Sequence, residues 1–204
     1  MKASARFTTI VAALLLGGCI NLGLGGSGPM PDLHRHTLDA AAGVAARPGN
    51  APSLAVRTFG SRSRYDIRVV RRDDADGFSY LEFERWGDLP GNALTDAVRE
   101  GLAGTGAFTS VSSAGDAFVV ERFLDGYLLA FELVKTASGP WKARLSVRLV
   151  LSDRSGKLLH TAVYTVTHDL PGDGPAGLGP AMSAAVGEVV NHAVADWDAA
   201  GLMK

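Results

Sequence analysis

The chain has 204 residues, with 20 Lys and Arg against 21 Asp and Glu, 5 His and 1 Cys. This length suits one domain of ordinary size, and a hydrophobic content of 47% supplies enough apolar surface for a core, which excludes a chain that is disordered throughout. A formal net charge of −1 gives no electrostatic basis for binding nucleic acid. A single Cys excludes an intramolecular disulfide framework and a metal site with several Cys ligands.

The first residues of the chain have the composition of a secretory signal peptide. Lys2 and Arg6 form a short positive region, and an apolar run over residues 7–16 follows. This run is shorter than the ~20 apolar residues that a membrane-spanning helix needs. The small residues Gly17 and Gly18 come next, where a signal peptidase requires small side chains.

These residues lead into a sequence that resembles a bacterial lipobox, Leu16-Gly17-Gly18-Cys19. In a lipobox the Cys thiol receives a diacylglycerol, and cleavage then leaves that Cys at the new N-terminus. We therefore predict a signal peptide over residues 1–18 and lipidation of Cys19; an ordinary signal peptide with a chance Cys and an uncleaved anchor are the alternatives. Two or three acyl chains hold a protein stably on a membrane. Ile20 rather than Asp follows Cys19, which favours the periplasmic face of the outer membrane.

Residues 19–52 are rich in Gly, Ala and Pro and show no sustained periodicity, which predicts a lipidated Cys followed by a flexible tether. Residues 23–28 match the pattern G-x-G-x-x-G. A dinucleotide-binding loop must follow a buried strand and begin a helix, so this match does not predict nucleotide binding. We expect the folded domain over residues 53–204.

The first half of this domain shows short β-prone runs and then a helical pattern. In chain order we predict strands over 54–59 and 65–70, a hairpin loop over 73–77, a strand over 78–86 and a helix over 89–103. Gly104 supplies a stop for this helix. The acidic loop is not expected to bind calcium, because an EF-hand alignment places Arg72 and Phe83 at the first and last ligand positions.

The second half shows the clearest alternation in the chain, over residues 141–151, where apolar side chains alternate with Lys, Arg and Ser. In chain order we predict short strands over 108–111 and 117–120, a turn or bulge at Asp125-Gly126, an apolar strand over 127–134, a hairpin of strands 141–151 and 157–167, and a helix over 180–198. The predicted fold class is therefore α+β, a two-layer sandwich of a mostly antiparallel sheet with two helices packed on one face.

The five histidines do not form a metal site in this interpretation. His34 and His36 lie in the expected tether without a rigid frame. His160 and His168 are ~26 Å apart on one strand, and His192 has no second His four residues further on. The chain also lacks a nucleophile elbow and a phosphate-binding loop. We predict no catalytic residue, no cofactor and no metal, and hence that the chain is not an enzyme.

Five arginines concentrate positive charge around the first strands: Arg62, Arg64, Arg68, Arg71 and Arg72. They suit docking to an acidic partner or to phospholipid headgroups. The alternative is an exposed sheet face whose counter-charges come from residues 73–84. The hairpin after residue 141 could in addition offer a sheet edge for oligomerisation.

The arrangement of these features resembles a known family. Arg85-Trp86 begins a helix with Leu89 and Leu94 on its apolar face, and the strands AFVVERF and YLLAFEL, a long hairpin and an Ala/Val-rich helix follow. Together with the lipobox they resemble the ABC-type transport auxiliary lipoproteins, the family of paraquat-inducible protein C, from about residue 54 to 198. Arg85 and Trp86 are the most specific part of the resemblance, as structural or docking residues.

The resemblance implies a non-enzymatic outer-membrane component of a lipid transport system. In such systems an inner-membrane ABC transporter works with an MCE-type protein that bridges the periplasm. The auxiliary lipoprotein would dock or anchor the far end of this bridge, as a ring of identical subunits held to the membrane by its N-terminal lipid. The alternative is an envelope-biogenesis lipoprotein, either a cell-wall synthase activator or a lipopolysaccharide assembly factor. A lipoprotein hydrolase is a third class.

Overall fold

The structure is a computed structural model of the chain, and it describes residues 32–39, 42–73, 77–116, 119–135, 139–172 and 174–204. The chain divides into two units, Met1–Pro31 and Asp32–Lys204, and every described residue belongs to the second unit. The predicted signal peptide, the lipobox and Cys19 therefore lie outside the described residues.

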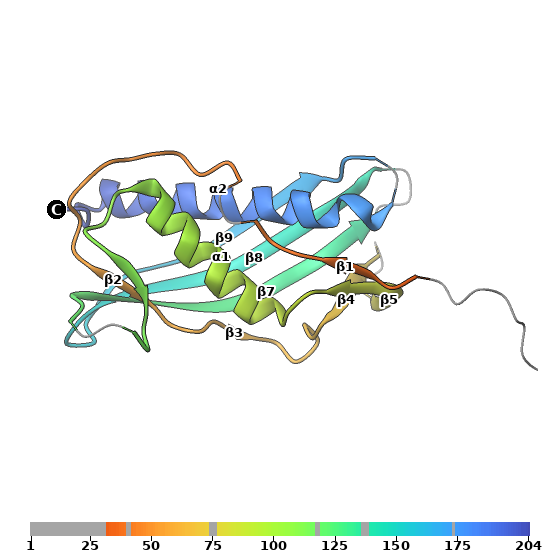
Figure 1. Cartoon of the computed structure of the whole chain (residues 1–204), viewed down its shortest axis with the longest axis horizontal. Helices are drawn as coiled ribbons and strands as arrows, with labels where there is room; N and C mark the ends of the chain where they lie inside the picture. The colour runs from red at the N-terminus through yellow and green to blue at the C-terminus, as the bar shows by residue number, and fades with distance from the viewer. Residues whose placement is uncertain (1–31, 40–41, 74–76, 117–118, 136–138, 173) are drawn as a thin grey trace, which may run out of the picture. The chain divides into compact units, whose positions relative to one another are not determined.

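The described part of the second unit contains nine strands, two α-helices and one short 3-10 helix (Figure 1). In chain order these elements are β1 (His34–His36), β2 (Leu54–Val56), β3 (Gly60–Ser61), β4 (Arg68–Arg72), β5 (Phe78–Trp86), α1 (Pro90–Thr105), β6 (Val111–Ser113), β7 (Arg122–Lys135), β8 (Trp141–Asp153), β9 (Leu158–Asp169), η1 (Pro175–Gly177) and α2 (Leu178–Ala199). The predicted α+β class is confirmed.

Long elements with a regular pattern agree best with the sequence predictions. β5 has the predicted bounds, and both helices begin and end within two residues of their predicted bounds.

The predicted strand over 117–120 is wrong in its second half, because Val119 and Val120 are not in a strand. Residues 117–118 lie outside the described part. The turn or bulge predicted at Asp125-Gly126 is wrong, since β7 runs through both residues and its register with β8 is regular there. A Cβ at Gly126 would lie 2.5 Å from the ring of Phe59, so this glycine makes room for a core side chain.

The sheet is built around β7, the longest strand. On one side β7 pairs antiparallel with β8 along its length, and β8 pairs antiparallel with β9. On the other side β7 pairs parallel with three short strands in succession, β2, β3 and β4. β5 adds antiparallel to β4, while β1 adds parallel to β5 and β6 adds parallel to β2.

The prediction of a mostly antiparallel sheet is therefore wrong, because five of these eight pairings are parallel. The reason is the crossover through α1. Antiparallel neighbours can be joined by a tight hairpin, whereas parallel neighbours need a long connection, usually a helix. α1 lies between β5 and β7 in the chain, and it carries the chain back so that β7 runs in the direction of β2, β3 and β4.

Both helices lie over the same face of the sheet, where α2 contacts β8 and β9 and α1 contacts α2 and β7 (Figure 1). α1 begins at Pro90, which suits a first helical turn because that turn leaves its N–H groups unpaired. It ends at Thr105, and Gly106 adopts φ 67° as the cap, two residues beyond the stop expected at Gly104. Since the apolar residues of β8 are buried beneath the helices, the alternation predicted for this strand is confirmed.

Residues 32–39 and 42–52, which we call the N-terminal strap, belong to the folded unit. The amide of Asp39 donates a 2.7 Å hydrogen bond to the hydroxyl of Ser183, and the amide of Ala45 donates a 2.9 Å bond to the side-chain oxygen of Asn191. The amide of Ala51 donates to the carbonyl of Ala107. The domain boundary expected near Ser53 therefore differs from the structure, where the compact unit begins at Asp32.

Candidate functional site

The predicted site residues fall into two groups. Leu16, Gly17, Gly18 and Cys19 precede the described residues, so the structure does not place them. Arg85 and Trp86 are the last two residues of β5, at the end of the sheet where β1, β4 and β5 meet. We call this region the β1–β5 end and describe it from the core outwards.

Trp86 anchors the β1–β5 end to the hydrophobic core. Its side chain is only 2% exposed, and its ring lies 4.5 Å from the ring of Phe131 on β7. On its other side it meets the ring of His36 edge-on at 5.7 Å. Trp86 therefore joins β1, β5 and β7, and it acts as a packing residue rather than as a surface contact.

Beside Trp86, Glu84 holds two histidines of β1. Its carboxylate is buried, and one oxygen lies 3.0 Å from Nδ1 of His34 while the other lies 2.6 Å from Nε2 of His36. His36 is also buried, whereas His34 is largely exposed. The expectation that His34 and His36 lack a rigid frame is therefore wrong, because both belong to β1, which pairs with β5.

This His34–Glu84–His36 cluster fastens the first described strand to the rest of the sheet. A buried carboxylate is costly unless polar groups satisfy it, and here each oxygen has its own imidazole partner. Among the described residues, no group of three or more His, Cys, Asp and Glu side chains is arranged to hold a metal ion. The arrangement suits a structural latch on the chain as it enters the domain.

Arg85 lies on the opposite face of β5 from Glu84 and Trp86. Its Nη1 donates hydrogen bonds to the carbonyls of Leu81 and Glu84, at 3.0 and 2.9 Å. In the sheet register Arg85 is opposite Arg35 of β1 on one side and opposite Arg68 of β4 on the other. Directly paired residues of neighbouring strands share one face, so three arginines form a row across three strands.

Arg71 and Arg72 of β4 each have a carboxylate partner. Arg72 donates a 2.7 Å hydrogen bond to Glu132, a carboxylate that is 1% exposed. Tyr65 also donates to Glu132, and burial together with the charge of that carboxylate raises the pKa of the Tyr65 phenol. Arg71 pairs with Asp73. A counter-charge from residues 73–84 is therefore found for Arg71, whereas the partner of Arg72 is Glu132 on β7.

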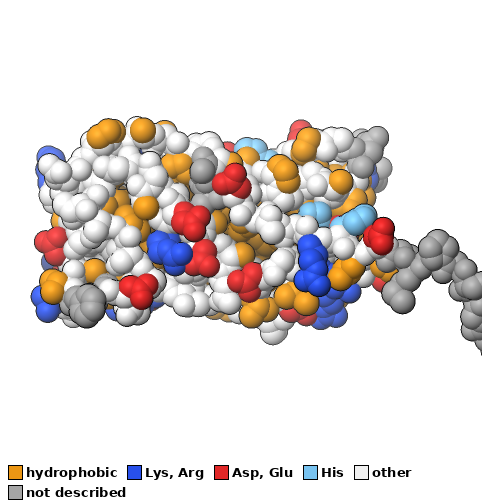
Figure 2. All heavy atoms as spheres, viewed as in Figure 1, with side chains coloured by type: hydrophobic (Ala, Val, Ile, Leu, Met, Phe, Trp, Pro, Cys, Tyr) orange, Lys and Arg blue, Asp and Glu red, His pale blue; other side chains and the backbone are white. Residues whose placement is uncertain are grey.

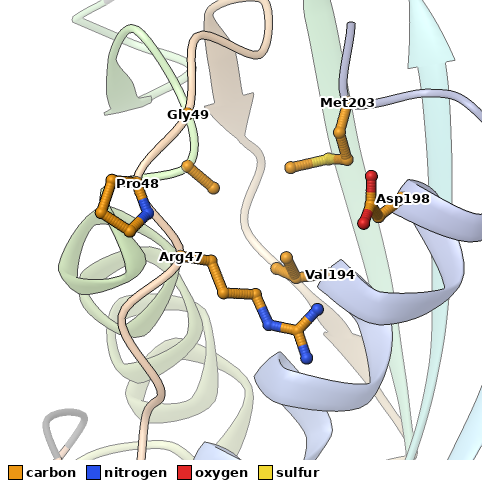
Figure 3. Close-up of a pocket in the computed structure, with 7 residues that line it drawn as sticks. Arg47, Pro48, Gly49, Val194, Asp198 and Met203 are labelled. Carbon is orange, nitrogen blue, oxygen red and sulfur yellow. The ribbon is translucent and has the colours of Figure 1, made fainter.

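A pocket of about 420 Å³ lies elsewhere in the unit, between the strap and the end of α2 (Figure 3). It is lined by Arg47, Pro48, Gly49, Ala107, Val194, Asp198 and Met203. Figure 3 shows Val194 and Met203 on one side of the pocket and the Arg47 side chain reaching across from the strap. The lining offers apolar surface and two opposite charges, which suits the binding of a ligand.

Sequence reasoning missed the strap, and with it both the pocket and the histidine latch. One signal was present in α2, where Ser183, Gly187 and Asn191 recur every four residues within an otherwise apolar helix. Residues four apart share one helix face, so this small and polar stripe marks where another segment approaches closely. All three residues contact the strap: a Cβ at Gly187 would overlap the carbonyl of Ala42.

Comparison with known proteins gives a family and a fold. The family model for ABC-type transport auxiliary lipoprotein components matches residues 36–194. A crystal structure of protein XCC0632 from Xanthomonas campestris, assigned to the family DUF330, aligns with a TM-score of 0.68 and 17% identity over 83% of this chain and 96% of that one. A second crystal structure, of an uncharacterized protein, aligns with a TM-score of 0.65 and 11% identity over 81% of this chain and 99% of that one. No protein in the curated set matches the chain significantly.

Proposed function

The chain belongs to the family of ABC-type transport auxiliary lipoprotein components, and on that premise we propose that it is an anchored docking subunit for lipid transport between membranes. In this proposal Cys19 carries the lipid, and the folded unit faces the periplasm from the outer membrane. Its partners are an inner-membrane ABC transporter, an MCE-type bridging protein and further copies of this chain. The role is one of binding and positioning, without catalysis.

The family match carries this proposal. It runs from residue 36 to residue 194, from within β1 to within α2, so it includes the sheet, both helices and most of the strap. A match of this extent concerns the whole folded unit rather than a shared fragment. Membership in a transport-associated family then favours the transport role over the cell-wall and lipopolysaccharide alternatives.

The proposed anchor is consistent with the rest of the chain. None of the helices in the described ranges has the length and apolar character needed to cross a membrane. The sequence has one Cys, and it follows a short apolar run and two glycines. Attachment through a lipid on Cys19 would leave the compact unit, Asp32–Lys204, free to meet partners away from the bilayer.

The test is affinity purification of the full chain, tagged after Lys204, from cross-linked cell envelopes. We expect MCE-type and ABC transporter components to be recovered with the tagged protein. An untagged strain and a strain with an unrelated tagged outer-membrane lipoprotein serve as controls. Recovery of cell-wall synthases or lipopolysaccharide-assembly proteins, without any transporter component, would contradict the transport role.

A further inference from the structure

The row formed by Arg35, Arg85 and Arg68 is unusual for a sheet. Like charges directly opposite one another on neighbouring strands are destabilising. Arg68 is neutralised, because it donates hydrogen bonds of 2.5 to 3.1 Å to Asp66, and these bonds lower the pKa of that carboxyl. Among the described residues neither Arg35 nor Arg85 forms an ion pair with a carboxylate: Arg85 donates to backbone carbonyls, and its charge acts on Asp66 only at longer range, where it adds to the lowering of that carboxyl's pKa.

Apolar side chains flank these two unpaired charges. Leu33 precedes Arg35 by two positions and is 47% exposed, and Phe83 precedes Arg85 by two positions and is 38% exposed. Residues two apart along a strand share one face, so Phe83 lies beside Arg85 on β5. Leu33 directly precedes β1, two positions before Arg35. Figure 2 shows basic and apolar side chains gathered beside the histidines at this end of the unit. A ligand that combines an anionic group with apolar chains would pair with the arginines and cover the exposed apolar side chains.

The position of this surface in the chain indicates which anion is at hand. β1 is the first described strand, and the chain from Leu33 back to Cys19 has 14 residues. Even a fully extended segment of that length spans at most about 50 Å. A lipid on Cys19 would therefore keep this face within reach of a bilayer, and this step rests on the lipid anchor of the proposed function.

We infer that Leu33, Arg35, Phe83 and Arg85 form a membrane-contact surface that binds the phosphate groups of anionic phospholipids. Arginine pairs with phosphate in a forked geometry, and each basic residue near an anionic surface contributes about fivefold to binding. Leu and Phe lie at the boundary between headgroups and acyl chains, as they do in interfacial segments. The surface orients the domain on its lipid anchor.

The experiment uses the mature lipoprotein reconstituted into vesicles, with Phe83 replaced by the photo-reactive p-benzoylphenylalanine. Phospholipid adducts are measured by mass spectrometry in phosphatidylcholine vesicles and in vesicles with about one third phosphatidylglycerol. We expect a strong adduct only with phosphatidylglycerol. It should fall steeply in about 1 M salt, where the Debye length is about 3 Å. The control site is Leu158, which is 55% exposed and lies at the opposite end of β7, and it should give little adduct.

Two charge variants decide whether the arginines are responsible. Joint substitution Arg35→Gln and Arg85→Gln should lower the Phe83 adduct by roughly 25-fold, while Arg35→Lys with Arg85→Lys should retain most of it. Arg154→Gln, in an exposed turn, should have no effect. Equal adducts in both vesicle types, equal adducts at Leu158, or an unchanged adduct in the Gln variant would overturn the inference. The mass of the N-terminal peptide reports lipidation of Cys19 in the same sample, so a missing anchor is recognised separately.

Discussion

Arg85 and Trp86 are neighbours in the sequence, yet they serve opposite faces of β5. Trp86 is buried against Phe131, while Arg85 lies in the row of arginines on the other face. The resemblance to the family identified the pair but not this division, because side-chain direction depends on the register of β5 with β1 and β4. The structure therefore assigns packing to Trp86 and a surface role to Arg85.

Replacing these two residues in turn should separate their roles. We expect Trp86→Ala to lower the free energy of unfolding by about 3–5 kcal/mol, because it leaves a large cavity beside Phe131. Arg85→Ala should lower the free energy of unfolding by less than about 1 kcal/mol, because the hydrogen bonds of Arg85 go to backbone carbonyls at a partly exposed site. Urea unfolding followed by circular dichroism measures both. Similar losses for the two variants would contradict this division.

Glu84 should hold β1 through its negative charge. Glu84→Gln keeps the shape but weakens both imidazole contacts, so we expect a loss of about 1–3 kcal/mol and faster amide hydrogen exchange in β1. Glu82→Gln is the matched control, since Glu82 is exposed on the same strand. The latch would be refuted if both variants had the same exchange rates in residues 34–36 as the unaltered protein.

At the scale of elements, the packing of the strap on α2 is the feature with the largest consequence for the fold. Ser183, Gly187 and Asn191 form one stripe of α2, and they receive a segment more than 140 positions earlier in the chain. Nothing in the strap itself predicts this, because after β1 its bonds go to a helix face and to the loop after α1 rather than to a regular ladder. The strap closes one side of the pocket through Arg47, Pro48 and Gly49.

Two glycine substitutions test whether the strap is required. Gly187→Ala would place a methyl group against the carbonyl of Ala42. We expect this substitution to lower the free energy of unfolding by about 1–3 kcal/mol or to displace the strap from α2. Gly104→Ala, on an open position of α1, should instead stabilise the protein by up to about 1 kcal/mol. Thermal unfolding compares the two variants. Stabilisation by both would show that the strap does not pack on α2.

The contact between β9 and α2 should show in the pH dependence of stability. Tyr164 donates a 3.0 Å hydrogen bond to Asp196, and burial, this bond and the carboxylate charge raise the pKa of the phenol. The folded state then keeps a proton that the unfolded chain loses, so the stabilisation is complete below about pH 10 and declines as the pH rises further. Between about pH 9 and 11 the unaltered protein should lose more stability than Tyr164→Phe, measured by urea unfolding. Tyr127→Phe is the control, and identical losses in all three would contradict the contact.

At the scale of the whole molecule, the proposed lipid anchor on Cys19 lies 13 positions before the start of the compact unit at Asp32. We expect Cys19→Ser to abolish lipid attachment and the cleavage that follows it. Mass spectrometry should then show an N-terminus that still includes residues 1–18, and the domain should retain its circular dichroism spectrum because Asp32–Lys204 is compact by itself. A lipidated or correctly cleaved Cys19→Ser protein would refute the lipobox.

Much of the architecture could be read from short stretches of sequence. The bounds of β5, the alternation of β8 and both helices follow from periodicities of two and 3.6 residues, and these depend only on which neighbouring side chains face the core. Charge, the apolar run and a single Cys likewise predicted the anchor from residues adjacent in the chain. The resemblance added the family, which the match over residues 36–194 confirms.

Only the tertiary structure decided which strands are neighbours and what the strap does. The parallel pairing of β7 with β2, β3 and β4, and the bonds from His34 and His36 to Glu84, join residues about 50 to 70 positions apart. Such contacts form when separate elements bury a common core, so no local periodicity records them. For the same reason the arginine row is invisible in the sequence: its members come from three strands, and the sheet register places them side by side.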